Sequence, residues 1–136
     1  MLLQIHLIAV SFWCGLVAAE VVAERCAKGA DARRTVANVH RWIDNLFEIP
    51  IVIVVLASGG LLLAQVWPGT PLLWVKVGAA LIAIVANLIC MPLVQARVHA
   101  SDDGRARALT RQIGITGLAI PFMLIAFAIG LAGAVS

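Results

Sequence analysis

The stretch "IPIVIVVLASGGLLLAQV", residues 49–66, decides the fold of this chain. Its eighteen residues carry no charge, and an α-helix needs about 20 mostly apolar residues, at least about 17, to cross the hydrocarbon core of a bilayer. A membrane strand is a poor alternative because the run is too long and lacks strict polar and apolar alternation. A helix also satisfies its own backbone hydrogen bonds, which lipid cannot do. The stretch therefore predicts a transmembrane helix.

Three more apolar segments, at roughly 2–19, 72–94 and 113–135, have similar length. Hydrophobic residues make up 62% of the 136 residues and charged residues 12%, whereas a soluble domain has about 45–50% and about 25%. The mean hydropathy is +1.03. Such a chain cannot hide its apolar surface from water, so lipid must be part of its solvent.

We therefore predict an all-α fold, a four-helix transmembrane bundle with up-down-up-down topology. Residues 1–136 form one integral membrane domain. The predicted transmembrane helices cover approximately residues 2–24, 40–66, 71–97 and 110–135.

The basic residues predict the orientation of the bundle. Nine of the ten lie in the first and third connections between the predicted helices: Arg25, Lys28, Arg33, Arg34, Arg41, Arg97, Arg105, Arg107 and Arg111. Both connections lie on the same side, and the positive-inside rule makes that side the cytoplasm. We expect a bacterial-type inner membrane with both termini outside. The pI near 9.1 then reflects this asymmetry, and nothing in the sequence indicates nucleic-acid binding. The lipid bilayer is the predicted partner, and a homo-oligomer or a larger membrane complex stays open.

A polar motif, "HRWIDNLFEIP" (residues 40–50), leads into the apolar run. His40, Asp44 and Glu48 stand four residues apart and share one helix face, because such residues drift by only about 40° per step. The first helix carries a similar pair, Glu20 and Glu24. Both sets lie at the cytoplasmic ends of sequential antiparallel helices, so we expect them to face each other.

Four carboxylates that converge need cations, because like charges repel. Arginines at similar depth (Arg41, Arg97 and Arg111) are one source. A metal ion is the other, since carboxylates with histidine are the ligands of di-iron and di-manganese bundles and also suit zinc. One hypothesis is therefore a metal site for Fe, Mn or Zn built from Glu20, Glu24, His40, Asp44 and Glu48. The alternative is a set of interfacial salt bridges without a metal.

Two further features of the sequence bear on the site. Pro50 has no amide hydrogen, so it leaves the carbonyl of Leu46 without its helical donor beside Glu48. Cys14 and Cys90 are expected to pack as ordinary buried thiols. No residue can be assigned a catalytic role from the sequence.

The segment "IHLIAVSFWCGL", residues 5–16, resembles the first helix of HemJ-type protoporphyrinogen oxidases and of the broader CopD-like membrane proteins, with His6, Trp13 and Gly15 at the matching positions. "HRWIDNLFEIP" is similar to the start of their second helix, and "LLWVKVG", residues 72–78, to the start of their third. The resemblance implies haem b binding at His6 and a functional role for Lys76.

The chain also departs from that family. Glu20 stands near a position where the family has arginine, and Asn87 is the nearest polar residue to a third-helix histidine that is absent here. Three functions therefore stay open. They are a membrane protein that binds a metal ion or redox cofactor through the carboxylate and histidine cluster, a HemJ-like haem b or porphyrin-handling oxidoreductase, and a structural or accessory subunit without a cofactor. If the chain is an enzyme, we expect a membrane oxidoreductase.

Overall fold

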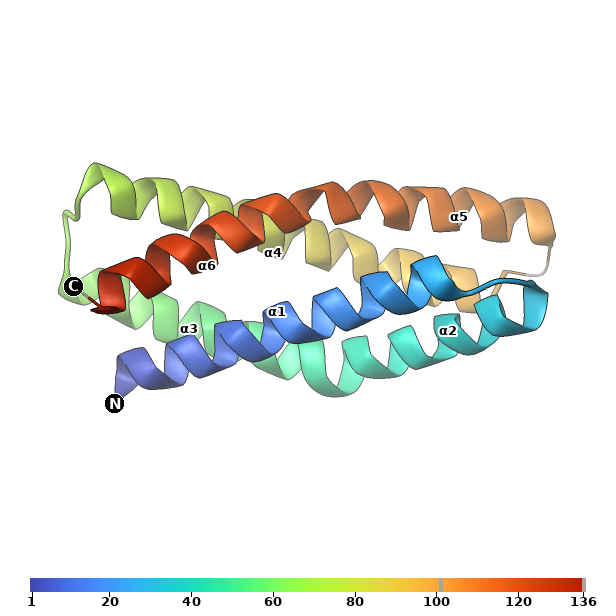
Figure 1. Cartoon of the computed structure of the whole chain (residues 1–136), viewed down its shortest axis with the longest axis horizontal. Helices are drawn as coiled ribbons and strands as arrows, with labels where there is room; N and C mark the ends of the chain where they lie inside the picture. Colours follow the sequence, from blue (N-terminus) through green and yellow to red (C-terminus); the bar gives the residue numbers. More distant parts are fainter. Residues whose placement is uncertain (101, 136) are drawn as a thin grey trace.

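The computed structural model describes residues 1–100 and 102–135, and within these ranges it contains helices and turns but no strand. Four helical rods make up the fold (Figure 1). They are α1 (Leu2–Cys26), α2 (Ala30–Ile43) continued by η1 (Asp44–Glu48) and α3 (Ile49–Gln65), α4 (Pro71–Val98), and α5 (Asp103–Thr116) continued by η2 (Gly117–Ala119) and α6 (Ile120–Val135). Each rod is long and apolar enough to cross a membrane. The predicted all-α four-helix bundle is therefore confirmed.

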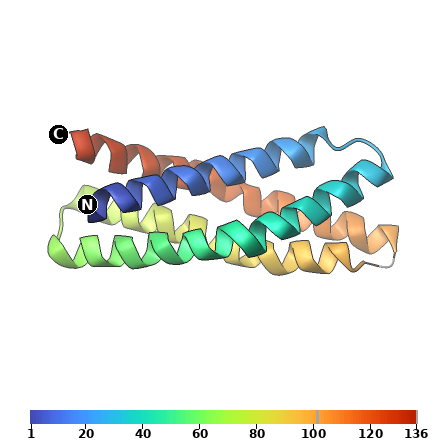
Figure 2. The same cartoon turned by 90° about the horizontal axis from the view of Figure 1, so that it is seen from below.

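The rods alternate in direction. Both termini and the turn between α3 and α4 lie at one end, and the other two connections lie at the opposite end (Figures 1 and 2). The second and fourth rods begin earlier than predicted, at Ala30 and Asp103 rather than near residues 40 and 110. The prediction counted only the apolar length that lipid requires, whereas the helices continue beyond it into polar residues.

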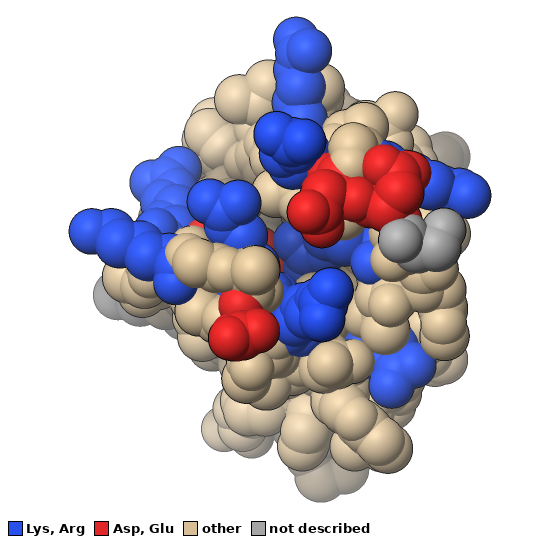
Figure 3. Space-filling view, turned by 90° about the vertical axis from the view of Figure 1, so that its right-hand side faces the viewer, with Lys and Arg blue, Asp and Glu red and all other residues tan. Residues whose placement is uncertain are grey.

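Basic residues gather at the end that carries the connections after α1 and after α4. Figure 3 looks onto this end and shows many lysine and arginine side chains with a few acidic ones among them. The predicted charge asymmetry along the bundle is therefore present. Which side of a membrane this end faces stays a prediction.

Two rods change their winding just before a proline. In η1 the helix widens to a π-turn, in which the amide of Ile49 donates to the carbonyl of Asp44, and Pro50 follows. In η2 the helix tightens to a 3₁₀-turn, and Pro121 follows. A proline lacks an amide hydrogen and its ring collides with the carbonyl four residues earlier, so the preceding turn must rearrange. Pro92, in contrast, lies inside an uninterrupted α4.

The core lies between the rods at mid-height. Trp13, Val52, Ala83, Ile84 and Met123 form its buried cluster. In the bundle, α1 packs along α3, while α4 packs along α5 and α6 and touches α2. The α1 and α5 helices scarcely touch, and this separation leaves room for the cavity described below.

Candidate metal centre

The structure brings the five predicted residues together where α1 meets α2 and η1. The ring of His40 lies between carboxylates, with Nδ1 3.0 Å from Glu24 Oε1 and Nε2 3.4 Å from Glu20 Oε2 and 3.8 Å from Asp44 Oδ1. Exposure is 6% for Glu20 and His40, 2% for Asp44 and zero for Glu48, whereas the Glu24 side chain keeps 21%. Glu20 and Glu24 therefore converge with His40, Asp44 and Glu48 as expected. Most of this cluster is buried.

One side of the His40 ring is held in place by an ion pair. Glu24 can only accept a hydrogen bond as a carboxylate, so Nδ1 of His40 carries the hydrogen. Arg97 of α4 in turn holds Glu24 through both guanidinium Nη atoms, with Nη1 2.9 Å from Oε2. A carboxylate that fixes one ring nitrogen is the usual support of a metal-binding histidine, because it sets the tautomer and orients the other nitrogen. That other nitrogen, Nε2, faces Glu20 and Asp44.

The ligand atoms of Glu20, His40 and Asp44 have nearly the spacing of a metal site. One ligand atom each from Glu20, His40 and Asp44 lies within 4.8 Å of the others. Bonds of about 2.0–2.1 Å to a tetrahedral metal place neighbouring ligand atoms about 3.3–3.4 Å apart. The separation of 3.4 Å between His40 and Glu20 matches such an edge, and that of 3.8 Å to Asp44 requires a small inward movement. Both separations are longer than an ordinary hydrogen bond, about 2.7–3.2 Å.

Several carboxylate oxygens of the cluster have no hydrogen-bond partner of ordinary geometry among the described residues. Within the described residues, Glu20 Oε1, Asp44 Oδ2 and both oxygens of Glu48 are buried without a hydrogen bond of ordinary geometry. Glu48 does lie close enough to Asp44 and Asn87 to interact with them. Buried polar atoms in proteins nearly always have a partner, and these oxygens are able to accept a hydrogen bond, take up a proton or coordinate a cation.

The π-turn explains how η1 aligns its two carboxylates with His40. In an uninterrupted α-helix the eight residues from His40 to Glu48 would drift by about 80° around the axis. The wider η1 turn winds less per residue, and this returns Glu48 towards the face of His40. π-Turns are rare and occur often at functional sites.

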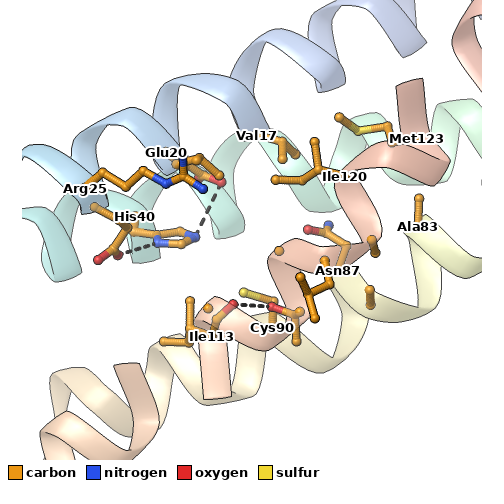
Figure 4. Close-up of a pocket in the computed structure, with 18 of the residues that line it drawn as sticks. Val17, Glu20, Arg25, His40, Ala83, Asn87, Cys90, Ile113, Ile120 and Met123 are labelled. Atoms are coloured by element: carbon orange, nitrogen blue, oxygen red, sulfur yellow. Dashed lines mark hydrogen bonds and ion pairs between the residues drawn. The ribbon is translucent and has the colours of Figure 1, made fainter. Parts of the chain in front are cut away.

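A cavity of about 350 Å³ adjoins the cluster between α1, α4, α5 and η2 (Figure 4). Glu20, Glu24 and His40 contribute to its lining, together with Asn87 and Cys90 of α4. Cys90 also lies close enough to His40 to interact with its ring. Sequence reasoning gave Asn87 and Cys90 no role in this site. Asn87 is an isolated polar residue and Cys90 an isolated thiol in an apolar part of α4. Their positions in the sequence do not show which way their side chains face.

His6 and Lys76, which the family resemblance singled out, do not join this cluster. They line a separate cavity of about 40 Å³. The buried His6 ring places Nδ1 2.9 Å from Ser58 Oγ. Of the three arginines expected near the carboxylates, Arg97 pairs with Glu24, while Arg41 and Arg111 form no ion pair within the described ranges.

Comparisons of the chain with known protein families, with curated proteins and with solved structures gave no match.

Proposed function

We propose that this membrane protein binds a divalent metal ion, Fe, Mn or Zn, through Glu20, His40 and Asp44. One observation carries the proposal. His40 Nε2 faces two buried carboxylates, while Nδ1 is fixed by Glu24 and, through it, by Arg97. This is the donor set, with its supporting hydrogen bond, that a transition metal prefers.

Charge balance supports a cation in the cluster. Four carboxylates converge there, and among the described residues only Glu24 has an arginine partner within ion-pair distance. Buried charges without partners are costly, above all in a membrane. Within residues 1–100 and 102–135 no arginine pairs with Glu20, Asp44 or Glu48, so the interfacial salt-bridge alternative would rest on a protonated His40, which lies within ion-pair distance of Glu20 and Asp44.

The proposed roles of the five residues differ. Glu20, His40 and Asp44 would be ligands, Glu24 would orient the imidazole, and Glu48 would supply a further buried carboxylate beside Asp44. Three protein ligands leave a coordination position open, and a metal with an open position supplies Lewis-acid chemistry, or redox chemistry in the case of iron or manganese.

The haem alternative has weaker geometric support. The cavity lined by His6 and Lys76 measures about 40 Å³, which is close to the space of one water molecule, about 30 Å³. A porphyrin is many times larger. The third alternative, an accessory subunit, predicts a chain without any bound ion.

Elemental analysis and an absorbance spectrum of the same purified sample test the proposal. We expect about one metal ion per chain and no Soret band. His40→Gln should lose the metal, whereas His99→Gln should keep it, because His99 is exposed at the end of α4. A wild-type protein that contains no metal and shows no thermal shift with Zn²⁺, Mn²⁺ or Fe²⁺ would refute the proposal.

A further inference from the structure

The cavity beside the cluster has the size and lining of a small-molecule site. Its volume of about 350 Å³ falls in the range of such pockets, about 300–1,000 Å³. Most of its wall is apolar and includes Trp13, Val17, Ile113, Ile120 and Met123. In Figure 4 the apolar side chains of Val17, Ile120 and Met123 lie towards one end and His40 and Glu20 towards the other. A ligand that fits must therefore be mostly apolar, with its polar group at one end.

The polar atoms in the lining indicate what that group is. Trp13, which is 3% exposed, packs with Met123 at the apolar end and lines both cavities, so its Nε1–H, without a hydrogen-bond partner among the described residues, is not assigned to the polar end. Asn87 Nδ2, which also belongs to the lining, makes no hydrogen bond of ordinary geometry. This atom is a donor. A ligand with an acceptor oxygen would satisfy a donor that is otherwise buried at a cost.

The net charge of the site favours a ligand with a neutral acceptor oxygen over one with a carboxylate. The four carboxylates, the guanidinium of Arg97 and a divalent ion together leave about one negative charge, and a carboxylate ligand would add another. Arg25 at the edge of the cavity is exposed to solvent and therefore screened. A neutral carbonyl oxygen accepts a hydrogen bond and can take the open metal position without this repulsion.

We infer that the cavity binds a neutral, mostly apolar molecule with a carbonyl oxygen that points towards the metal site. The inference rests on the proposed function, because the metal supplies the open position. Gly114 on α5 contributes to the available volume. A Cβ placed there would meet no atom within 4 Å, and the residue is exposed, so the cavity opens to the surface of the bundle at this wall.

Equilibrium dialysis of acetophenone against the protein in nanodiscs, with empty nanodiscs as the blank, tests the inference. We expect one saturable site per metal-loaded chain. Ethylbenzene lacks the oxygen and benzoate carries a charge, so both should bind more weakly. Asn87→Leu should weaken acetophenone binding roughly threefold to tenfold, the value of one hydrogen bond, and should leave ethylbenzene unchanged.

A pair of glycine variants controls for partition into lipid. Gly114→Leu should block the site. Gly78→Leu should not, because Gly78 is equally open but lines neither cavity. Binding that is equal in these two variants, or equal for acetophenone and ethylbenzene, would overturn the inference.

The metal content of every sample is measured, so that failure of the inference and failure of the proposed function can be told apart. A metal-loaded protein that does not bind acetophenone refutes this inference alone. A protein that takes up no metal refutes the proposed function. It then also refutes the inferred orientation of the ligand, with its carbonyl oxygen towards the metal site.

Discussion

Arg97→Met is the sharpest test of the electrostatic arrangement around His40. Arg97 is 9% exposed and holds Glu24 with both Nη atoms. Removing one partner of a buried ion pair costs about 3–5 kcal/mol because the other charge is left uncompensated. Since the Glu24 side chain keeps 21% of its exposure, water can solvate it in part, so we expect a loss of about 3 kcal/mol, at the low end of that range.

The measurement is reversible unfolding in mixed micelles, without added metal. Arg107→Met serves as the control, because Arg107 is exposed on α5 and such surface substitutions usually stay within about 0.5 kcal/mol. The double variant Arg97→Met with Glu24→Met should be more stable than Arg97→Met alone, since it no longer buries an unpaired carboxylate. If Arg97→Met matches the control, or if the double variant loses the sum of the two single losses, then the ion pair does not have the role argued above.

Three other predictions concern the metal and the membrane. A metal ion at a hundredfold excess over its dissociation constant should stabilise the wild-type fold by about 2.7 kcal/mol, and a melting curve that does not move with the concentration of Zn²⁺, Mn²⁺ and Fe²⁺ would contradict this. Glu48→Gln should weaken metal binding in a titration more than Asp102→Asn, because Glu48 is fully buried beside Asp44 whereas Asp102 is an exposed helix cap; equal affinities would exclude Glu48 from the site. Reporter fusions at the C-terminus should report the periplasmic side, and a cytoplasmic signal would reverse the predicted orientation.

The positions of the helices follow from the local sequence. Apolar length and backbone hydrogen bonding are local properties, so runs such as residues 49–66 predict a spanning helix whatever its neighbours are. The helical period likewise predicted that His40, Asp44 and Glu48 share a face, and the π-turn in η1 brings Glu48 fully into line. Because the first two predicted helices are sequential and antiparallel, Glu20 and Glu24 are expected to face them, and the structure brings the two sets together.

How these residues divide their roles depends on how the rods pack against one another. The spacing treats Glu20 and Glu24 alike, but the rotation of α4 around its axis brings Arg97 to Glu24 and leaves Glu20 on the Nε2 side of the ring. Helix rotation depends on how side chains pack between rods, which one helix's own sequence does not specify. For the same reason the sequence could not choose Arg97 over Arg41 and Arg111.

The π-turn and the cavity also lie beyond sequence reasoning. Pro50 predicts an interruption near Leu46, but a kink, a tightened turn and a widened turn all relieve the clash with its ring. The structure has the widened turn, and that choice aligns Glu48 with His40. The cavity exists because α1 and α5 stand apart over α4. Such a separation is a property of three packed helices, and it is this separation that places Asn87, Cys90 and the indole of Trp13 around one space.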